Sequence, residues 1–132
     1  MTNSTLIKMI DNTDLNKASK INDNYYLCKY NEYEYFIILC NEQKAGGVLN
    51  CGDDIHIIIK PEFQGNHLMS NFLHSKLIQK YWKNIKSCNL VPEAFKDRND
   101  IIKKIHLARK AGLKIANMKQ VLNYYNNIFI ND

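Results

Sequence analysis

The most informative part of the sequence is the stretch Ile55-His56-Ile57-Ile58-Ile59-Lys60-Pro61-Glu62-Phe63-Gln64-Gly65-Asn66-His67-Leu68-Met69-Ser70. Apart from His56, its first five residues are all apolar, which is typical of a central strand covered on both faces. Pro61 ends this strand, because proline has no N–H to donate to a sheet. A helix is predicted from Leu68 onward, after a short loop that contains Gly65. A buried strand leading through a tight loop into a helix favours a sheet with helices packed on it.

The start of this helix also predicts a site for an anion. The first N–H groups of a helix have no partner within it, and this end of the helix dipole is positive. Phosphate groups bind readily at such a terminus. Gly65 would let a diphosphate approach the main chain closely. The alternative is that Gly65 only makes the turn into the helix.

Before this stretch the sequence predicts a short helix and a β-meander. The spacing of Leu6, Met9 and Ile10 favours a short amphipathic helix near the N-terminus. Aromatic and β-branched runs separated by polar turns then predict three strands, over residues 25–30, 33–40 and 45–51. The strand over residues 55–59 is the fourth.

After this stretch, helices and strands are predicted to alternate. Apolar residues at three- and four-residue steps predict one continuous helix over residues 68–82. A fifth strand over residues 87–91 stops before Pro92, and residues 93–98 form a connector. The last elements are a helix ended by Gly112 and two final strands, over residues 113–116 and 121–130.

The second long helix is expected to begin at a polar residue. Asn99 or Asp100 is predicted to cap it. Its buried stripe is predicted to consist of four residues: Ile101, Ile102, Ile105 and Ala108. The whole pattern predicts a mixed α/β (α+β) fold in a single domain of residues 1–132.

Composition excludes several classes of protein. The chain has 132 residues, of which 45% are hydrophobic and 23% charged, the balance of an ordinary folded domain. No apolar run approaches the roughly 20 residues that span a bilayer. No secretory signal is visible, so a cytoplasmic location is expected. The net charge of +5 is spread over helix faces, so nucleic-acid binding is not favoured.

The cysteines do not predict a metal site. Cys28, Cys40, Cys51 and Cys88 are scattered through the sequence without a closely spaced pair. Zinc sites usually contain such pairs. We therefore expect reduced thiols and no metal.

Two segments resemble the GNAT superfamily of acyl-CoA-dependent N-acetyltransferases. The stretch Ile57–Ser70 is similar to its central motif, a buried strand followed by Arg/Gln-x-x-Gly-x-Gly/Ala opening a helix. Gln64 matches the first position and Gly65 the small residue that often follows, whereas His67 and Met69 stand where small residues are expected.

The second segment, Ile105–Lys114, resembles the last helix of the family, with Leu113 in place of the usual Phe. Asn99 resembles an Asn that the family places before this helix, although it lies two residues further from the Gly than is typical. The resemblance covers roughly residues 25–120, with both motifs in the expected order.

The resemblance implies a GNAT-like, mostly antiparallel sheet flanked by helices, with the fourth and fifth strands splayed apart. In such a fold the donor acetyl-CoA lies in the splay. Its pantetheine arm would pair with the main chain of Ile57 and Ile59. Its pyrophosphate would lie on a run of amides: Gln64, Gly65, Asn66, His67, Leu68 and Met69. Asn99 is carried over as a further coenzyme-binding position.

The implied reaction is transfer of an acetyl group to a primary amine of a protein or small molecule, by direct attack through a tetrahedral intermediate. The N-terminal part is short for the family, so a homodimer partner is one way to complete the acceptor site. A different class of function is also open: a degenerate GNAT-fold module that binds a partner or an acyl-CoA without turnover.

A base must remove a proton from the amine, and His56 is the first candidate because an imidazole pKa suits this task. His56 is otherwise a partly buried strand residue, and Asp53 and Asp54 before the strand are alternatives. The family's helical Tyr acid corresponds here to Ala108. Tyr124, or its neighbour Tyr125, is the candidate replacement acid.

Overall fold

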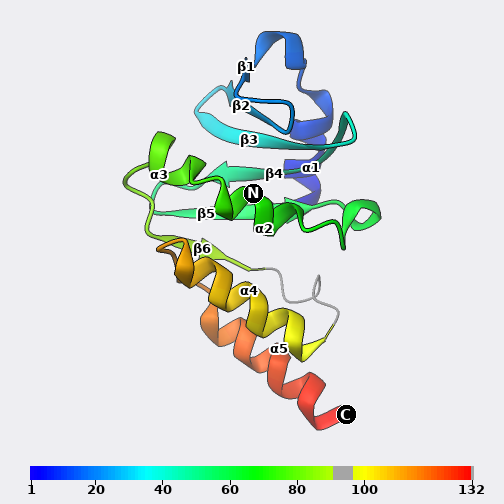
Figure 1. The fold of residues 1–132 in the computed structure, drawn as a ribbon, viewed down its shortest axis with the longest axis vertical. Helices are drawn as coiled ribbons and strands as arrows, with labels where there is room; N and C mark the ends of the chain where they lie inside the picture. Colours follow the sequence, from blue (N-terminus) through cyan, green and yellow to red (C-terminus); the bar gives the residue numbers. More distant parts are fainter. Residues whose placement is uncertain (91–96, 132) are drawn as a thin grey trace.

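The computed structural model describes residues 1–90 and 97–131 (Figure 1), and within these ranges it contains one seven-stranded sheet with strand order β1 to β7. The strands are β1 (Ser19–Lys20), β2 (Tyr25–Tyr30), β3 (Tyr33–Cys40), β4 (Gln43–Asn50), β5 (Asp54–Ile59), β6 (Ser87–Asn89) and β7 (Lys114–Ile115). Strands β1 to β5 pair antiparallel, whereas β5, β6 and β7 pair parallel. The expected mixed, mostly antiparallel sheet with flanking helices is confirmed.

Helices cover both faces of the sheet, with α1 behind it and α2 and α3 in front (Figure 1). The helices are α1 (Asn3–Asn12), α2 (Leu68–His74), α3 (Leu77–Tyr81), α4 (Arg98–Lys110) and α5 (Met118–Asn131), with 3-10 turns at Leu15–Lys17 and Pro61–Phe63. Two core clusters follow from this layering. One joins α2, α3, α4 and α5 to the sheet, and the other joins α1 to it.

Strand β5 contributes to both clusters. Ile55 and Ile57 belong to the α2–α5 cluster, while Ile58 belongs to the α1 cluster. Neighbouring side chains of a strand point to opposite faces, so the run of isoleucines fills both sides of the sheet. The covered central strand expected from the sequence is therefore present.

A glycine allows α1 to lie close to β4. A Cβ on Gly47 would lie 2.5 Å from the Cδ1 atom of Ile10 and 2.9 Å from the carbonyl oxygen of Phe36. Ile10 is completely buried. The absent side chain therefore lets α1 seat directly on the sheet.

The predicted helix over residues 68–82 is wrong in one respect, because it is broken into α2 and α3. Lys76, between the two helices, has φ 60°, which is left-handed. The Ser75 hydroxyl donates a hydrogen bond to the carbonyl of Phe72, which offers that carbonyl a partner other than the helix backbone. The apolar spacing continues across the break, so periodicity alone does not reveal it.

The predicted strand over residues 121–130 is also wrong, because these residues lie in α5. Val121 is fully buried, and Tyr124 and Tyr125 pack partly buried against the same cluster. Their spacing of three and four residues is helical. The aromatic and β-branched composition favoured a strand, but packing beside α4 decides the outcome.

The predicted cap of the second long helix is shifted. Asp97 is the N-cap of α4, and its side chain accepts the N–H of Asp100; Asn99 and Asp100 both lie inside the helix. Ile102, predicted to be buried, is 40% exposed. The predicted strand end at residue 91 and most of the connector over residues 93–98 lie outside the described residues.

Candidate functional site

The hydrogen-bonded ladder between β5 and β6 stops partway along β5. Its register pairs are Asp54 with Ser87, Ile55 with Cys88, and His56 with Asn89. Strand β5 continues to Ile59 and remains paired there with Gly46 of β4. Within the described ranges, the last three residues of β5 therefore lie beyond the end of this ladder.

The main chain of Ile57 and Ile59 faces the β6 side of β5. A hydrogen bond marks each end of the β4–β5 ladder. At one end the N–H of Lys60 donates to the carbonyl of Ala45 at 2.8 Å. At the other end the N–H of Cys51 donates to the carbonyl of Asp54 at 2.9 Å. Hydrogen-bonded and non-bonded pairs alternate in an antiparallel ladder. Ile57 and Ile59 fall at the alternate positions, so their polar main-chain groups point away from β4.

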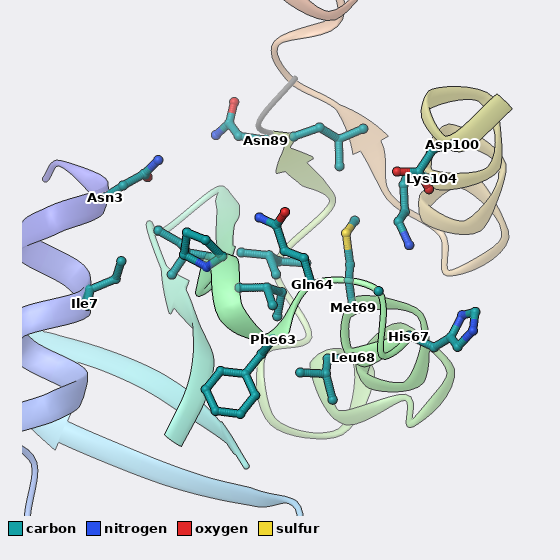
Figure 2. A pocket seen from close by; sticks show the side chains of 16 residues that line it. Asn3, Ile7, Phe63, Gln64, His67, Leu68, Met69, Asn89, Asp100 and Lys104 are labelled. Atoms are coloured by element: carbon teal, nitrogen blue, oxygen red, sulfur yellow. The ribbon is translucent and has the colours of Figure 1, made fainter. Parts of the chain in front are cut away.

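A cavity of about 560 Å³ lies at this point (Figure 2). It is lined from α1 by Asn3 and Ile7, and from α4 by Asp100 and Lys104. The other lining residues come from β5, the following loop, α2 and the end of β6: Ile57, Ile58, Ile59, Pro61, Phe63, Gln64, Gly65, His67, Leu68, Met69, Asn89 and Leu90. Because its lining includes residues from both faces of the sheet, the cavity extends through the gap between β5 and β6.

The loop before α2 adopts a backbone suited to glycine at two positions. Gly65 has φ 89°, and His67 has φ 58° although it is not a glycine. His67 thus has the conformation of the glycine expected at this position. Figure 2 shows its imidazole directed away from Gln64 and from the space between α1 and α4.

Only some of the amide groups in this loop are available to bind an anion. The N–H of Gln64 donates to the carbonyl of Pro61 at 3.3 Å, so it belongs to the 3-10 turn. For the N–H groups from Gly65 to Ser70, no acceptor is present in the described part of the chain. Unpaired amides at the start of a helix favour a negative charge nearby.

A lysine of α4 lies close to the first turn of α2. The ammonium of Lys104, on α4, is 3.5 Å from the hydroxyl of Ser70 on α2. Lys104 and Met69 project into the same space (Figure 2). One end of the cavity therefore combines the ammonium of Lys104, the carboxylate of Asp100 and the amides of the helix start, whereas its middle is apolar.

Polar side chains gather where β5 and β6 are still paired. The Nε2 atom of His56 is 2.6 Å from Oδ1 of Asn3, and Asn89 donates to the carboxylate of Asp54 at 2.7 Å. Burial lowers the pKa of His56, as does the positive N-terminus of the chain, while Asp54 opposes the shift. An imidazole with a lowered pKa is neutral near pH 7 and so able to accept a proton.

Most of the predicted coenzyme-binding residues line the cavity, but the predicted catalytic pair does not. His56 contacts the lining residue Asn3 without itself lining the cavity. Tyr124 packs against the core from α5. Asn66 bonds the carbonyl of Phe63, and Asn99 is exposed in the first turn of α4; neither lines the cavity.

Sequence reasoning did not find Asn3, Ile7, Asn89 and Lys104, which also line the cavity. These residues come from three separate segments and carry no shared motif. The signal that identifies Asn89 is the β5–β6 register, which pairs it with His56 and which the sequence alone does not give. Lys104 looked like an ordinary solvated helix lysine.

No protein-family model matches the chain, and neither a curated protein nor a solved structure matches it. Within the described ranges, no group of three or more His, Cys, Asp or Glu side chains is placed to hold a metal ion. None of the helices in those ranges combines the length and apolar character needed to cross a membrane.

Proposed function

We propose that the protein is an acyl-CoA-dependent N-acyltransferase, with acetyl-CoA as donor and a primary amine as acceptor. The observation that carries this proposal is the cavity that passes through the sheet where β5 and β6 part. A passage of this kind lets a donor and an acceptor approach one point from opposite faces. The expected cytoplasmic location remains part of the proposal.

The chemistry of the cavity suits the three parts of coenzyme A. The apolar middle suits the pantetheine arm, whose amide groups can bond the main chain of Ile57 and Ile59 as a further strand would. The N–H groups from Gly65 to Ser70 and the ammonium of Lys104 suit the diphosphate. The adenosine would lie outside, toward solvent.

Transfer requires a neutral amine, because an ammonium has no lone pair. In the proposed step, His56 takes a proton from the acceptor ammonium through a water molecule, since it lies beside the cavity rather than in its wall. The amine nitrogen then attacks the thioester carbon, the C–N bond forms, the C–S bond breaks, and coenzyme A leaves as thiolate. The thiolate takes up the second proton released by the amine.

Turnover with a panel of primary amines tests this proposal. We expect wild-type protein to release free coenzyme A from acetyl-CoA and to form the acetylated amine, followed by chromatography and mass spectrometry. His56→Ala should lower kcat by about 100-fold or more, the usual contribution of a general base, with little change in the Kd for acetyl-CoA. His74→Ala, which removes an exposed imidazole on α2, is the matched control and should change neither value.

The second candidate function is a module that binds acyl-CoA, or a partner, without turnover. It is favoured by Tyr124, which packs against the core and does not line the cavity, and by Ala108, which is completely buried where the family has its acid. Binding of acetyl-CoA without any acetylated product would support this candidate. Equal loss of kcat and of donor binding in His56→Ala would assign His56 to packing.

A further inference from the structure

His56 lies on the face of the sheet that α1 covers. Its neighbours Ile55 and Ile57 belong to the α2–α5 cluster, whereas Ile58 belongs to the α1 cluster. Because the side chains of a strand alternate between the two faces, His56 points to the same face as Ile58. Its imidazole reaches the first turn of α1, where Nε2 is 2.6 Å from Oδ1 of Asn3. Asn3 also lines the cavity.

The other end of α1 is also fixed to the sheet. The ammonium of Lys60, the residue after β5, is 2.6 Å from the carboxylate of Asp11, and the Lys60 side chain is only 14% exposed. Lys44 of β4 donates to the main-chain carbonyls of Asp11 and Thr13, where the helix ends. Helix α1 is therefore anchored at both ends, which sets the position of Asn3 beside β5.

The side chain of Asn3 is not used to cap α1. An Asn near the start of a helix commonly accepts a main-chain N–H of the first turn with its side-chain oxygen. In α1 that acceptor is the hydroxyl of Thr2, which accepts the N–H of Thr5 at 3.1 Å. The carboxamide oxygen of Asn3 is therefore available to His56.

This oxygen determines which ring nitrogen of His56 carries the proton. A carboxamide oxygen has no hydrogen and can only accept, so Nε2 is the donor. A neutral imidazole has one N–H and one lone pair, so Nδ1 then holds the lone pair. Because the carboxamide of Asn3 is uncharged, it orients the ring without stabilising the imidazolium as a carboxylate would.

We propose that Asn3 is the positioning residue of His56: it holds the ring with Nε2 protonated, so that Nδ1 accepts the proton of the acceptor. In this step an N–H bond of the acceptor ammonium breaks, the water between them passes the proton to Nδ1, and His56 becomes an imidazolium. Two charged groups act on the ring: the positive N-terminus of the chain opposes the imidazolium, and Asp54 favours it. The proton transfer rests on the proposed function, whereas the hydrogen bond does not.

Nitrogen NMR of the histidine rings at pH 7.5 tests the hydrogen bond directly. Wild-type His56 should show a single tautomer, with a proton on Nε2 and none on Nδ1. The exposed rings of His74 and His106 are internal references and should each show a mixture of the two tautomers. In Asn3→Ala, His56 should also become a mixture. A proton on Nδ1 in the wild type, or an unchanged tautomer in Asn3→Ala, would overturn the role of Asn3.

The pH profile of the reaction connects the hydrogen bond to proton transfer. Asn3→Asp keeps the shape of the side chain but places a carboxylate against Nε2, so it should raise the titration midpoint of His56 by about one pH unit. The acid limb of kcat/KM should move by the same amount, because it reports the base of the free enzyme. Asn12→Asp adds the same charge at an exposed position at the other end of α1 and should move neither.

The two measurements separate this inference from the proposed function. A raised midpoint in Asn3→Asp with an acid limb that does not follow it would overturn proton transfer to Nδ1. A single tautomer with Nε2 protonated, in a protein that acetylates no amine, would support the role of Asn3 in holding the ring and refute the proposed function. If Asn3→Ala does not fold, Asn3→Asp decides, and an unmoved midpoint would overturn the contact with His56.

Discussion

His56 shows how a single residue couples stability to pH. Its pKa in the folded protein lies below the ordinary value, chiefly because burial disfavours the charged imidazole. The unfolded chain therefore binds more protons than the folded one once the pH falls below about 6.5, the unperturbed value. The neutral His56 imidazole therefore contributes to the stability of the fold above that pH. This contribution is lost as the pH falls toward the pKa of His56 in the folded protein.

We therefore expect His56→Gln to flatten part of the acid dependence of stability. Urea unfolding at pH 7.5 and pH 5.5 measures the free energy of unfolding of each protein. The wild type should lose more of it between the two pH values than the variant does. Identical losses would mean that His56 has the same pKa in the folded and the unfolded chain.

His67 shows that a sequence motif can indicate a backbone conformation without indicating where the side chain points. The family pattern has glycine here, and the backbone of His67 takes the left-handed conformation that glycine favours. The left-handed backbone is thus present although the residue is a histidine, and whether the loop serves the purpose of the family motif stays a prediction. The direction of the imidazole, away from Gln64, depends on three-dimensional packing and was not predictable from the sequence.

Among the elements, the break between α2 and α3 carries a measurable strain. Lys76 has φ 60°, and a left-handed conformation costs a residue with a Cβ about 1–2 kcal/mol. Glycine avoids that penalty but loses more backbone entropy on folding, by about 0.5–1 kcal/mol. We expect Lys76→Gly to raise the free energy of unfolding by roughly 0.5–1 kcal/mol.

Lys80→Gly is the matched control for this prediction. Lys80 is exposed within α3, where glycine should lower the free energy of unfolding by about 1 kcal/mol. Chemical unfolding of the two variants and the wild type gives both values. A loss of stability in both variants would contradict the strain assigned to Lys76.

Strand β5 was predicted correctly from its sequence pattern, whereas helix α5 was not. Consecutive isoleucines in β5 predicted a strand covered on both faces, because β-branched residues favour a strand and neighbouring side chains of a strand point to opposite faces. The helical spacing of Val121, Tyr124 and Tyr125 was outweighed by their strand-like residue types, and packing against α4 reversed that preference. Local patterns identify an element best when burial and propensity agree.

For the whole molecule, the cavity depends on contacts between distant segments. Gln64 and Gly65 were found because they follow one strand directly, whereas Asn3 and Lys104 reach the same space from α1 and α4. No linear sequence pattern shows that α1 and α4 line the same cavity. The part of the cavity lining that directly follows β5 was thus largely predictable, and the side built by α1 was not.

Calorimetric titration of acetyl-CoA into the wild type and two glycine variants tests whether the loop before α2 holds the donor. Gly65 and Gly52 are both exposed with positive φ, 89° and 95°, so glutamate strains both backbones alike, but Gly65 alone lines the cavity. We expect binding to the wild type and to Gly52→Glu with similar affinity. Gly65→Glu should bind at least about 100-fold more weakly, because a carboxylate facing a diphosphate costs several kcal/mol. Equal affinity in all three proteins would mean that the loop does not face the diphosphate, and no binding to the wild type would refute acetyl-CoA as the donor.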